Sequence, residues 1–382
     1  MRLWPFRGRP GRVSPSSQEL LVTEEVLRRS VEDVFVVRDC QIRTGIIAFR
    51  GELRVEPPRA LDALIARLRP FGYTPFLATE GNAVVLQVWP LAATVERARV
   101  AVNLVLFLLT CASTLVAGAF FSGSPTFDAL ARSPGVGRFF TGIPFAFTLL
   151  AILGVHEFGH YFTARHYGAS VSLPYFIPAP PPIFLFGTLG AIIRMRSPAK
   201  DRNSLFDIAA AGPLAGLAVA IPAIVLGLSW STVVPTPPGG YLEFGQSLLM
   251  RFLVQLRFGE IPPNMVLYTH PIADAAWAGF LVTALNLFPV GQLDGGRIAY
   301  ALFGRRHRLV GGITLGLLTL MGLLTGSLNW FVWAGLIFFL VGTHHAPPLD
   351  DLTPLSRGRR VVGFVCLVLL VRLVPPVPIE LG

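Results

Sequence analysis

The hydrophobic pattern of this 382-residue chain is dominated by uncharged segments long enough to cross a lipid bilayer. A transmembrane helix needs about 20 consecutive apolar residues, and loops that carry arginine separate these segments. The expected spans are residues 100–121, 139–164, 208–230 and 275–293, two helices within 309–343, and a short last segment at 361–374 that is either a span or an interfacial helix. The pattern predicts a polytopic α-helical membrane protein with about six or seven transmembrane helices.

The chain before the first expected span has the pattern of a small soluble domain. Short apolar runs predict strands, and Leu61, Leu64, Ile65 and Leu68 recur at helical spacing. The predicted strands are residues 34–37, 45–49 and 83–88, and the predicted helix is 59–69. No cluster of His, Cys or paired acids occurs there. We therefore expect a small N-terminal α+β soluble domain with a regulatory or substrate-docking role and no catalytic one.

Composition divides the chain into four parts. Residues 1–18 are basic, rich in proline and glycine and without periodicity, which predicts disorder. We expect 19–92 to form the α+β domain, 97–345 to form the membrane-embedded core, and 346–382 to hold a cytoplasmic loop and a C-terminal hydrophobic segment.

Charge sets the expected orientation and excludes one class of partner. Only 14% of the residues are charged, against about 25% in ordinary soluble domains, and the net charge is +10. Arg97 and Arg99 precede the first span, and basic loops favour the cytoplasmic side, so the N-terminal domain is expected there. The same rule accounts for the basic excess, and we expect no nucleic-acid partner. Residues 1–18 have neither the apolar region of a signal peptide nor a transit-peptide pattern, which favours a bacterial inner membrane.

The second expected span ends in the motif His156-Glu157-x-x-His160. Positions i and i+4 of a helix share one face, about 6 Å apart along the axis, so both imidazoles can bind one Zn²⁺. Glu157 would stand beside the metal and accept a proton from water. A chance match, with satisfied core histidines, is the alternative. Ionisable groups inside a span cost roughly 2.5–3.5 kcal/mol each, however, and therefore indicate a function.

Residues 168–204 do not fit a membrane span, because Pro174, Pro178 and the prolines at 180–182 interrupt any helix. The apolar run 183–193 is too short to cross. We interpret it as a re-entrant loop and strand, since irregular backbone at membrane depth is tolerated beside a cavity or other protein. Its edge could hold an extended peptide by strand addition, with Gly187, Thr188, Leu189 and Gly190 as the binding residues. An interfacial loop without catalytic importance is the alternative.

A second polar group follows the fourth expected span. Pro289 and the glycines after it would unwind the helix at the depth of Asp294. The basic residues 305–308 come next, so this end is cytoplasmic, like the end that carries His160. The two histidines and Asp294 are therefore expected at the same depth on the same side of the membrane.

Two histidines and one aspartate make three protein ligands, and a fourth position left open is typical of catalytic zinc. We expect one Zn²⁺ per chain on His156, His160 and Asp294, with Glu157 as general base. Asn286 lies eight residues before Asp294. Two roles for Asn286 stay open: it donates a hydrogen bond to the developing oxyanion, or it caps the broken backbone.

The paired motifs His156-Glu157-x-x-His160 and Asn286-x-x-Pro289, the latter followed by Asp294-Gly295, resemble the site-2 protease family of intramembrane zinc metalloproteases. The resemblance covers roughly residues 97–345. Gly212-Pro213 matches a segment found in many members. The N-terminal module with residues 49–51, the tail at 347–351 and the lack of an inserted PDZ-like domain resemble the cyanobacterial and plastid-type branch.

The resemblance implies the same zinc ligands and base, and hydrolysis of a peptide bond within or near the transmembrane segment of a membrane-anchored protein. The implied process is regulated intramembrane proteolysis, with a membrane-spanning protein as substrate and the lipid bilayer as surroundings. One alternative is a membrane metal transporter or sensor with the same ligands. Another is a catalytically silent scaffold, which the complete set of ligands and base argues against.

Overall fold

The fold is that of a computed structural model, which describes residues 17–43, 46–91, 99–121, 136–181, 184–237 and 242–381. The predicted disorder of residues 1–18 falls outside this set except for its last two residues. The chain divides into two compact units. The first unit comprises Met1–Arg97, Ser197–Leu205 and Ala346–Ser356, and the second comprises Ala98–Arg196, Phe206–His345 and Arg357–Gly382.

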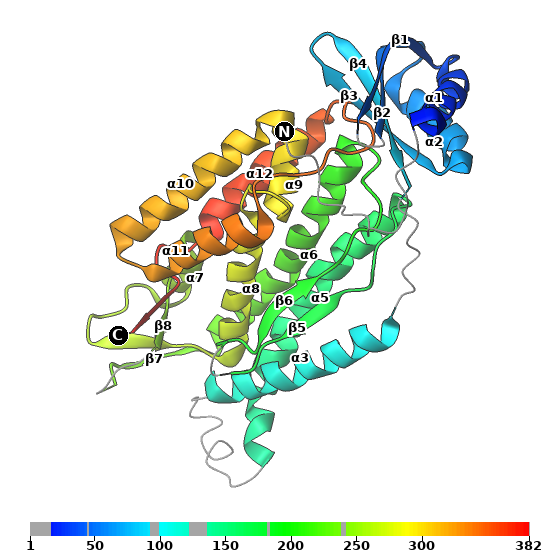
Figure 1. The fold of residues 1–382 in the computed structure, drawn as a ribbon. Coiled ribbons are helices and arrows are strands. Elements are labelled where there is room, and N and C mark those ends of the chain that lie inside the picture. The colour runs from blue at the N-terminus through cyan, green and yellow to red at the C-terminus, as the bar shows by residue number, and fades with distance from the viewer. Residues whose placement is uncertain are drawn as a thin grey trace. The chain divides into compact units, whose positions relative to one another are not determined.

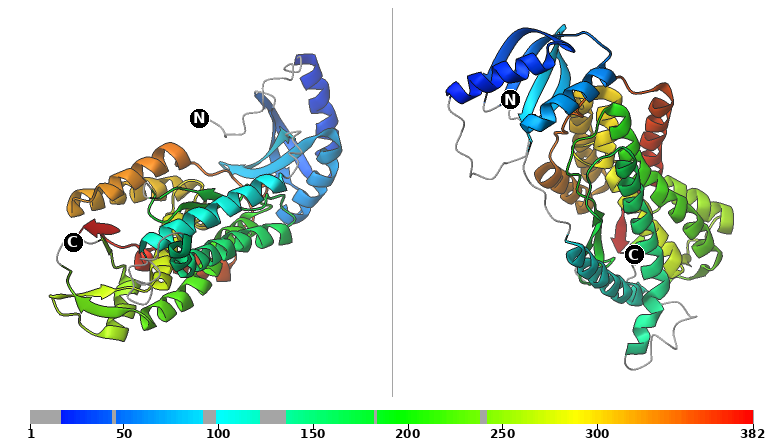
Figure 2. Two further views of the ribbon diagram at one scale, coloured as in Figure 1. Left: turned by 90° about the horizontal axis from the view of Figure 1, so that it is seen from below. Right: turned by 90° about the vertical axis from the view of Figure 1, so that its right-hand side faces the viewer.

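The first unit is built on a four-stranded antiparallel sheet in the order β1-β2-β4-β3. Helices α1 and α2 lie on one face of this sheet (Figures 1 and 2), where buried apolar side chains join them to the strands. The elements are α1 (Ser17–Val31), β1 (Phe35–Arg43), β2 (Ile46–Leu53), α2 (Pro57–Leu68), a 3₁₀ turn (Arg69–Phe71), β3 (Tyr73–Glu80) and β4 (Ala83–Pro90). The prediction of an N-terminal α+β region is confirmed.

The structure adds two elements that the sequence pattern does not predict, α1 and β3. In α1, Leu27 and Val31 are fully buried one helical turn apart, so the helix is held by packing on one face. Strand β3 contains Pro75, which argues against a central strand. The strand lies at the edge of the sheet, where a residue without an N–H is tolerated.

The free edge of β3 is covered by the segment Ala346–Ser356 of the same unit. The Leu77 amide donates to the carbonyl of Leu349 (2.7 Å), and the Asp351 amide donates to the carbonyl of Leu77 (3.0 Å). On its other side the segment continues the pairing, since the Asp350 amide donates to the carbonyl of Lys200 (2.8 Å). Covering an edge strand in this way protects it from pairing with another chain.

The second unit holds the apolar helices. Among the described residues, four helices are long and apolar enough to cross a membrane: Val100–Phe120, Phe139–His166, Arg202–Ser229 and Asp294–Thr325. Shorter apolar helices run over Pro271–Leu287 and Leu328–Phe339. The prediction of a polytopic α-helical protein agrees with this architecture.

The elements of the second unit follow one another along the chain as drawn in Figure 1. Its helices are α3 (Val100–Phe121), α5 (Ile143–His166), α6 (Arg202–Ser229, whose first turn belongs to the first unit), α7 (Leu248–Phe258), α8 (Pro271–Leu287), α9 (Asp294–Phe303), α10 (His307–Thr325), α11 (Leu328–Leu336) and α12 (Arg357–Leu373). Short 3₁₀-helices occupy Val136–Gly142 and Gly304–Arg306, and a short π-helix occupies Ile337–Val341. Three antiparallel strand pairs complete it: β5 (Tyr175–Pro178) with β6 (Thr188–Ile192), β7 (Thr232–Pro235) with β9 (Met265–Tyr268), and β8 (Leu242–Phe244) with β10 (Ile379–Leu381).

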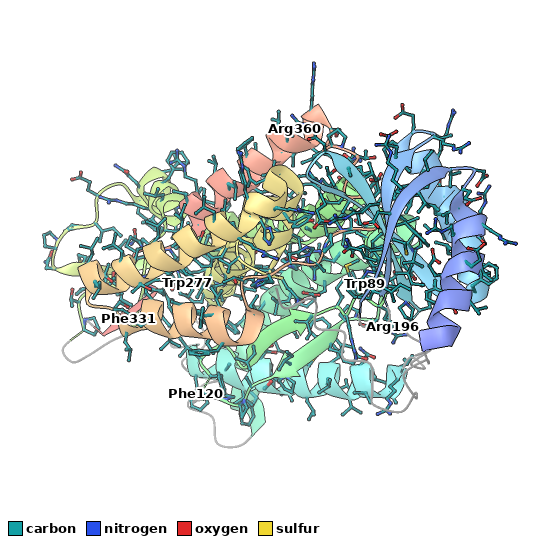
Figure 3. The ribbon with its side chains drawn as sticks, turned by 45° about the horizontal axis from the view of Figure 1, so that its top comes forward. Trp89, Phe120, Arg196, Trp277, Phe331 and Arg360 are labelled. Carbon is teal, nitrogen blue, oxygen red and sulfur yellow. The ribbon has the colours of Figure 1, made fainter. Side chains whose placement is uncertain are left out.

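Several helices of this unit expose large apolar side chains, as expected for surfaces that face lipid. On α10 they recur every three or four residues and form one stripe: Leu309, Ile313, Leu317, Leu320 and Leu324. Phe120 of α3 and Phe331 of α11, labelled in Figure 3, are likewise exposed. In water such a stripe would be an interaction site or an aggregation hazard, whereas in hydrocarbon it needs no covering.

Candidate metal centre

Helix α5 places the three side chains of the first motif in the interior of the second unit. His156, Glu157 and His160 are each no more than 5% exposed. The two imidazoles lie one turn apart on the same face, and their Nε2 atoms are 3.2 Å from each other. The helix is long and apolar enough to cross a membrane, so burial of three ionisable groups in it is a local cost that requires a compensating function.

Asp294 reaches this position because the chain changes direction between α8 and α9. Helix α8 ends at Leu287, and α9 begins at Asp294 itself. The turn folds back so tightly that a Cβ on Gly295 would lie 1.9 Å from the carbonyl oxygen of Leu287, and one on Gly296 would lie 2.4 Å from that of Gly291. Only glycine allows this approach, and the approach directs Asp294 toward α5.

The carboxylate of Asp294 meets both histidines. Its Oδ2 lies 3.0 Å from Nε2 of His160 and 3.4 Å from Nε2 of His156. One ligand atom from each of the three residues falls within 4.8 Å of the others, although Asp294 is 134 positions from His160 in sequence. The structure thus brings together the three residues that the sequence proposes as ligands.

The donor set and its surroundings fit a zinc ion. Two imidazole nitrogens and one carboxylate oxygen are ligands that Zn²⁺ takes in catalytic sites. His160 Nδ1 donates to the carbonyl oxygen of Ile208 on α6 (2.6 Å), which leaves Nε2 as the lone-pair nitrogen facing the other two candidate ligands. The side-chain nitrogen of Asn286 lies 3.5 Å from His156 Nε2, so this amide borders the same space.

Two glycines of α6 give the imidazoles room. A Cβ on Gly212 would lie 2.1 Å from His160 Nε2, and one on Gly216 would lie 3.2 Å from the Cβ of His156. The sequence singles out Gly212-Pro213 only through the family resemblance. The structure supplies the physical reason, because the ring of His160 packs directly on the Gly212 backbone.

Gly212→Ala should therefore displace the His160 ring and weaken metal binding by at least the roughly 10–100-fold that loss of an outer-shell partner costs. Gly216→Ala adds the same methyl group to the same helix at a distance that a small shift accommodates, and it should change binding far less. Competition with a zinc chelator in detergent measures both affinities. Equal affinities in the two variants would contradict the packing role of Gly212.

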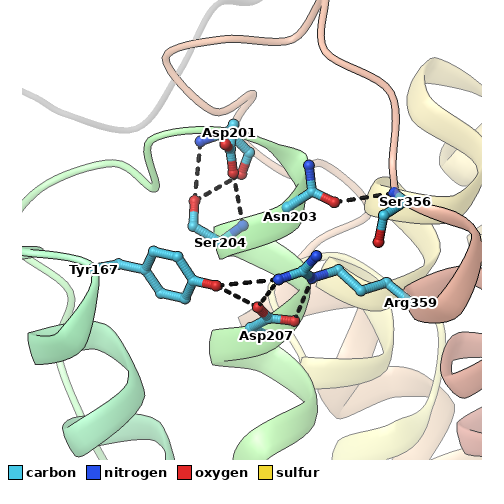
Figure 4. A network of polar contacts seen from close by, with 7 residues as sticks. All are labelled: Tyr167, Asp201, Asn203, Ser204, Asp207, Ser356 and Arg359. Carbon is cyan, nitrogen blue, oxygen red and sulfur yellow. Dashed lines mark hydrogen bonds and ion pairs between the residues drawn. The ribbon is translucent and has the colours of Figure 1, made fainter. Parts of the chain in front are cut away.

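A polar network holds the end of α5 against the start of α6 (Figure 4). Arg359 of α12 donates two hydrogen bonds to the carboxylate of Asp207, from Nε and Nη2, each 2.7 Å long. Tyr167, directly after α5, donates to the same carboxylate and accepts a hydrogen bond from Arg359 (3.3 Å). Burial and the neighbouring carboxylate raise the pKa of Tyr167. Asp207 precedes Ile208, whose carbonyl fixes the His160 ring, so the network anchors the segment that orients this ring.

Figure 4 also shows how α6 begins, within the first unit. The Ser204 amide donates to Oδ1 of Asp201 (2.7 Å), and the Asp201 amide donates to Ser204 Oγ (3.0 Å). This reciprocal pairing satisfies amide groups at the N-terminus of the helix. The Ser356 amide donates to Oδ1 of Asn203 (3.0 Å), which ties the covering segment to the same turn.

The predicted strand at 183–193 is present in part, as β6 of the β5–β6 hairpin. Gly187 has a φ of 73°, its carbonyl accepts a hydrogen bond from Ser113 of α3 (2.6 Å), and a Cβ there would strike α3. Thr188 is 9% exposed and donates to the carbonyl of Ile177 (2.9 Å). These two residues fasten the hairpin, whereas Leu189 is 59% exposed and Gly190 has open space beside it.

An aromatic cluster holds Phe186, two residues before β6. The rings of Phe244 and Trp277 stack with centroids 4.5 Å apart, and Phe186 lies 6.1 Å from Trp277, which Figure 3 labels. Trp277 of α8 also donates to the carbonyl of Gly245 (2.7 Å). The hairpin is therefore held by both α3 and α8 just before β6 begins.

A His-Glu-x-x-His helix inside an apolar bundle, completed by an aspartate from another helix, defines a membrane-embedded zinc metalloprotease. Comparison with known proteins agrees. The model of Peptidase family M50 matches residues 144–328, which hold every candidate ligand and Glu157. The chain belongs to this family, the site-2 protease family, and is an integral membrane protein.

Its curated relatives include chloroplast proteins of plants. The probable zinc metalloprotease EGY2, chloroplastic, of Oryza sativa subsp. indica is 29% identical over 98% of this chain and 70% of the relative. EGY2 of Arabidopsis thaliana is 30% identical over 93% and 65%, and EGY1 of the same plant is 32% identical over 63% and 44%. No solved structure matches the chain.

Proposed function

We propose that this protein hydrolyses a peptide bond within or near the transmembrane segment of a membrane-anchored protein, as in regulated intramembrane proteolysis. The observation that carries the proposal is the burial of His156, Glu157, His160 and Asp294 among helices long and apolar enough to cross a membrane. A protease that places its reactive groups in such surroundings is suited to substrates that share the membrane. Membership of a zinc metalloprotease family supports the reaction class.

The proposed roles follow from position. His156, His160 and Asp294 hold one zinc ion, which supplies Lewis acidity toward the scissile carbonyl and toward water. Glu157, next to a ligand and buried, accepts the proton of the attacking water and passes it to the leaving amine. Asn286 borders the same space, which supports oxyanion stabilisation, while its place in the last turn of α8 supports the capping role equally.

The proposed substrate site is the edge of β6 that has no strand partner among the described residues. An extended substrate segment would add to this edge through main-chain hydrogen bonds, beside Leu189 and Gly190. Gly187 and Thr188 would support the strand from behind. The backbone amide of Ile193, just after β6, interacts with the Glu157 carboxylate, which supports a bound segment lying next to the base.

We further propose six or seven spans with β5–β6 as a re-entrant element, a core of residues 97–345, and a cytoplasmic domain at 19–92. The side that carries the metal ligands faces the cytoplasm of a bacterial inner membrane. The arginines before the first span and the basic residues at 305–308 support this orientation.

The test is cleavage of single-span substrates by protein reconstituted in liposomes. Purified protein should cut at least one substrate inside or beside its span, and a zinc chelator should lower the rate to background, with recovery when zinc is restored. A metal transporter with the same ligands would instead move zinc into sealed vesicles and leave every substrate intact. Flux without cleavage would overturn the proposal.

A further inference from the structure

Arg297 is a charged residue of the site region to which the proposed reaction assigns no role. It lies on α9, three residues after Asp294, and is half-buried. Its Nη1 donates to the sulfur of Met195 (3.6 Å), which is the one hydrogen bond of this guanidinium to a residue that the structure describes. A thioether is a weak acceptor, and a guanidinium has five N–H donors. The other donors are therefore available to a further acceptor.

The charges around Arg297 do not supply that acceptor in the loaded enzyme. The positive charge of Arg297 acts on the Glu157 carboxylate. Asp294 lies on α9 with Arg297, one helical turn away. Neither carboxylate forms an ion pair with Arg297 among the described side chains, whereas Asp294 faces both histidines. A divalent cation at the three ligands would offset the two negative charges, and the guanidinium would then lack a counter-charge.

The position of Arg297 along the hairpin indicates which molecule supplies an acceptor for its guanidinium. Residues 193–196 continue β6 in extended form, because the Ser172 amide donates to the carbonyl of Arg194 (3.0 Å) and the Arg196 amide donates to that of Ser170 (2.8 Å). Glu157 interacts with this segment at Ile193, and Arg297 meets it at Met195. The two contacts are thus two residues apart, about 6–7 Å along a strand.

We propose that Arg297 determines substrate specificity by binding an acidic side chain of the substrate within about two residues of the scissile bond. The inference rests on the proposed function, with the substrate extended along β6. A segment whose scissile carbonyl lies at Glu157 has its neighbouring residues beside Met195 and Arg297. The planar fork of a guanidinium matches a carboxylate in two parallel hydrogen bonds, so Asp or Glu is favoured over neutral residues there and Lys is disfavoured.

The experiment measures binding separately from cleavage. Full-length Glu157→Gln protein, with its zinc content verified, is titrated in nanodiscs with single-span peptides that differ only in carrying Glu, Gln or Lys at positions on either side of the cleavage site. At one position the Glu peptide should bind at least about tenfold more tightly than the Gln peptide, the range expected of a hydrogen bond to a charged group. The added change Arg297→Glu should reverse the order and favour the Lys peptide.

Arg308→Glu is the matched control, because Arg308 is an exposed arginine near the start of the next helix and the charge change is the same. This variant should keep the preference for the Glu peptide. In otherwise wild-type protein, Arg297→Gln should raise KM for the Glu substrate and leave kcat within a few-fold.

Two results would overturn the inference. If the three peptides bind the protein with Arg297 equally tightly, Arg297 does not distinguish the charge of the substrate residue. If Arg297→Glu lowers the affinity for all three peptides equally, Arg297 has a structural role. If the preference is present and wild-type protein still cuts no substrate, the fault lies with the proposed function and not with Arg297.

Discussion

Replacing Glu157 by glutamine is expected to leave zinc bound and to lower the rate of substrate cleavage by about 10²–10⁴-fold, the range that positioned proton transfer contributes. The amide has nearly the same shape as the carboxylate but cannot accept the proton of water. Glu157 offers no ligand atom to the cluster of His156, His160 and Asp294, so the metal should stay. Loss of activity with retained zinc separates the base from the ligands.

Glu260→Gln provides the control, since this glutamate is exposed and outside the helices of the site. Its zinc content and its cleavage rate should match those of the wild type. Rates are best compared in single-turnover assays with one reconstituted substrate, and zinc is measured by elemental analysis of the same samples. Undiminished cleavage by Glu157→Gln would remove Glu157 from the mechanism.

The proposed metal ligands illustrate what a sequence can reveal about a membrane protein. His156 and His160 follow from helical spacing alone. Asp294 follows because two charged groups, far apart in sequence, each end an apolar segment on the same predicted side of the membrane. A bilayer restricts helices to a few orientations, so depth and side are nearly sufficient to bring such groups together.

The contacts that orient these ligands could not be predicted in the same way. The hydrogen bond from His160 to Ile208 and the packing of its ring on Gly212 depend on the rotation of α6 against α5. Both helices are apolar on all sides, so hydrophobic periodicity carries no information about which face meets which. The network of Tyr167, Asp207 and Arg359 joins residues up to 192 positions apart, and it could not be predicted from the sequence either.

The N-terminal unit shows a different limit. Its helix α2 and strands β2 and β4 follow from apolar spacing, but the pattern misses β3 because Pro75 reads as a strand breaker. The edge position that makes proline acceptable is a property of the whole sheet. Likewise, Leu349 and Asp351 complete the edge of a sheet at Leu77, about 270 positions earlier in the chain.

Asp294→Ala should reduce zinc affinity more than any outer-shell change, because it removes one of the three proposed ligands and leaves two adjacent imidazoles. The effect should exceed the roughly 10–100-fold typical of outer-shell partners. Asp39→Ala, at an exposed aspartate of the first unit, is the matched control and should bind zinc like the wild type.

The most direct measurement is the zinc content of detergent-purified wild type beside Asp294→Ala, after both are dialysed against the same weak chelator. We expect about one zinc per wild-type chain and little or none in the variant. Such a result would show that two motifs 134 positions apart in sequence form one metal site. Equal zinc in both proteins would show that Asp294 is not a ligand, and its absence from both would contradict the metalloprotease mechanism.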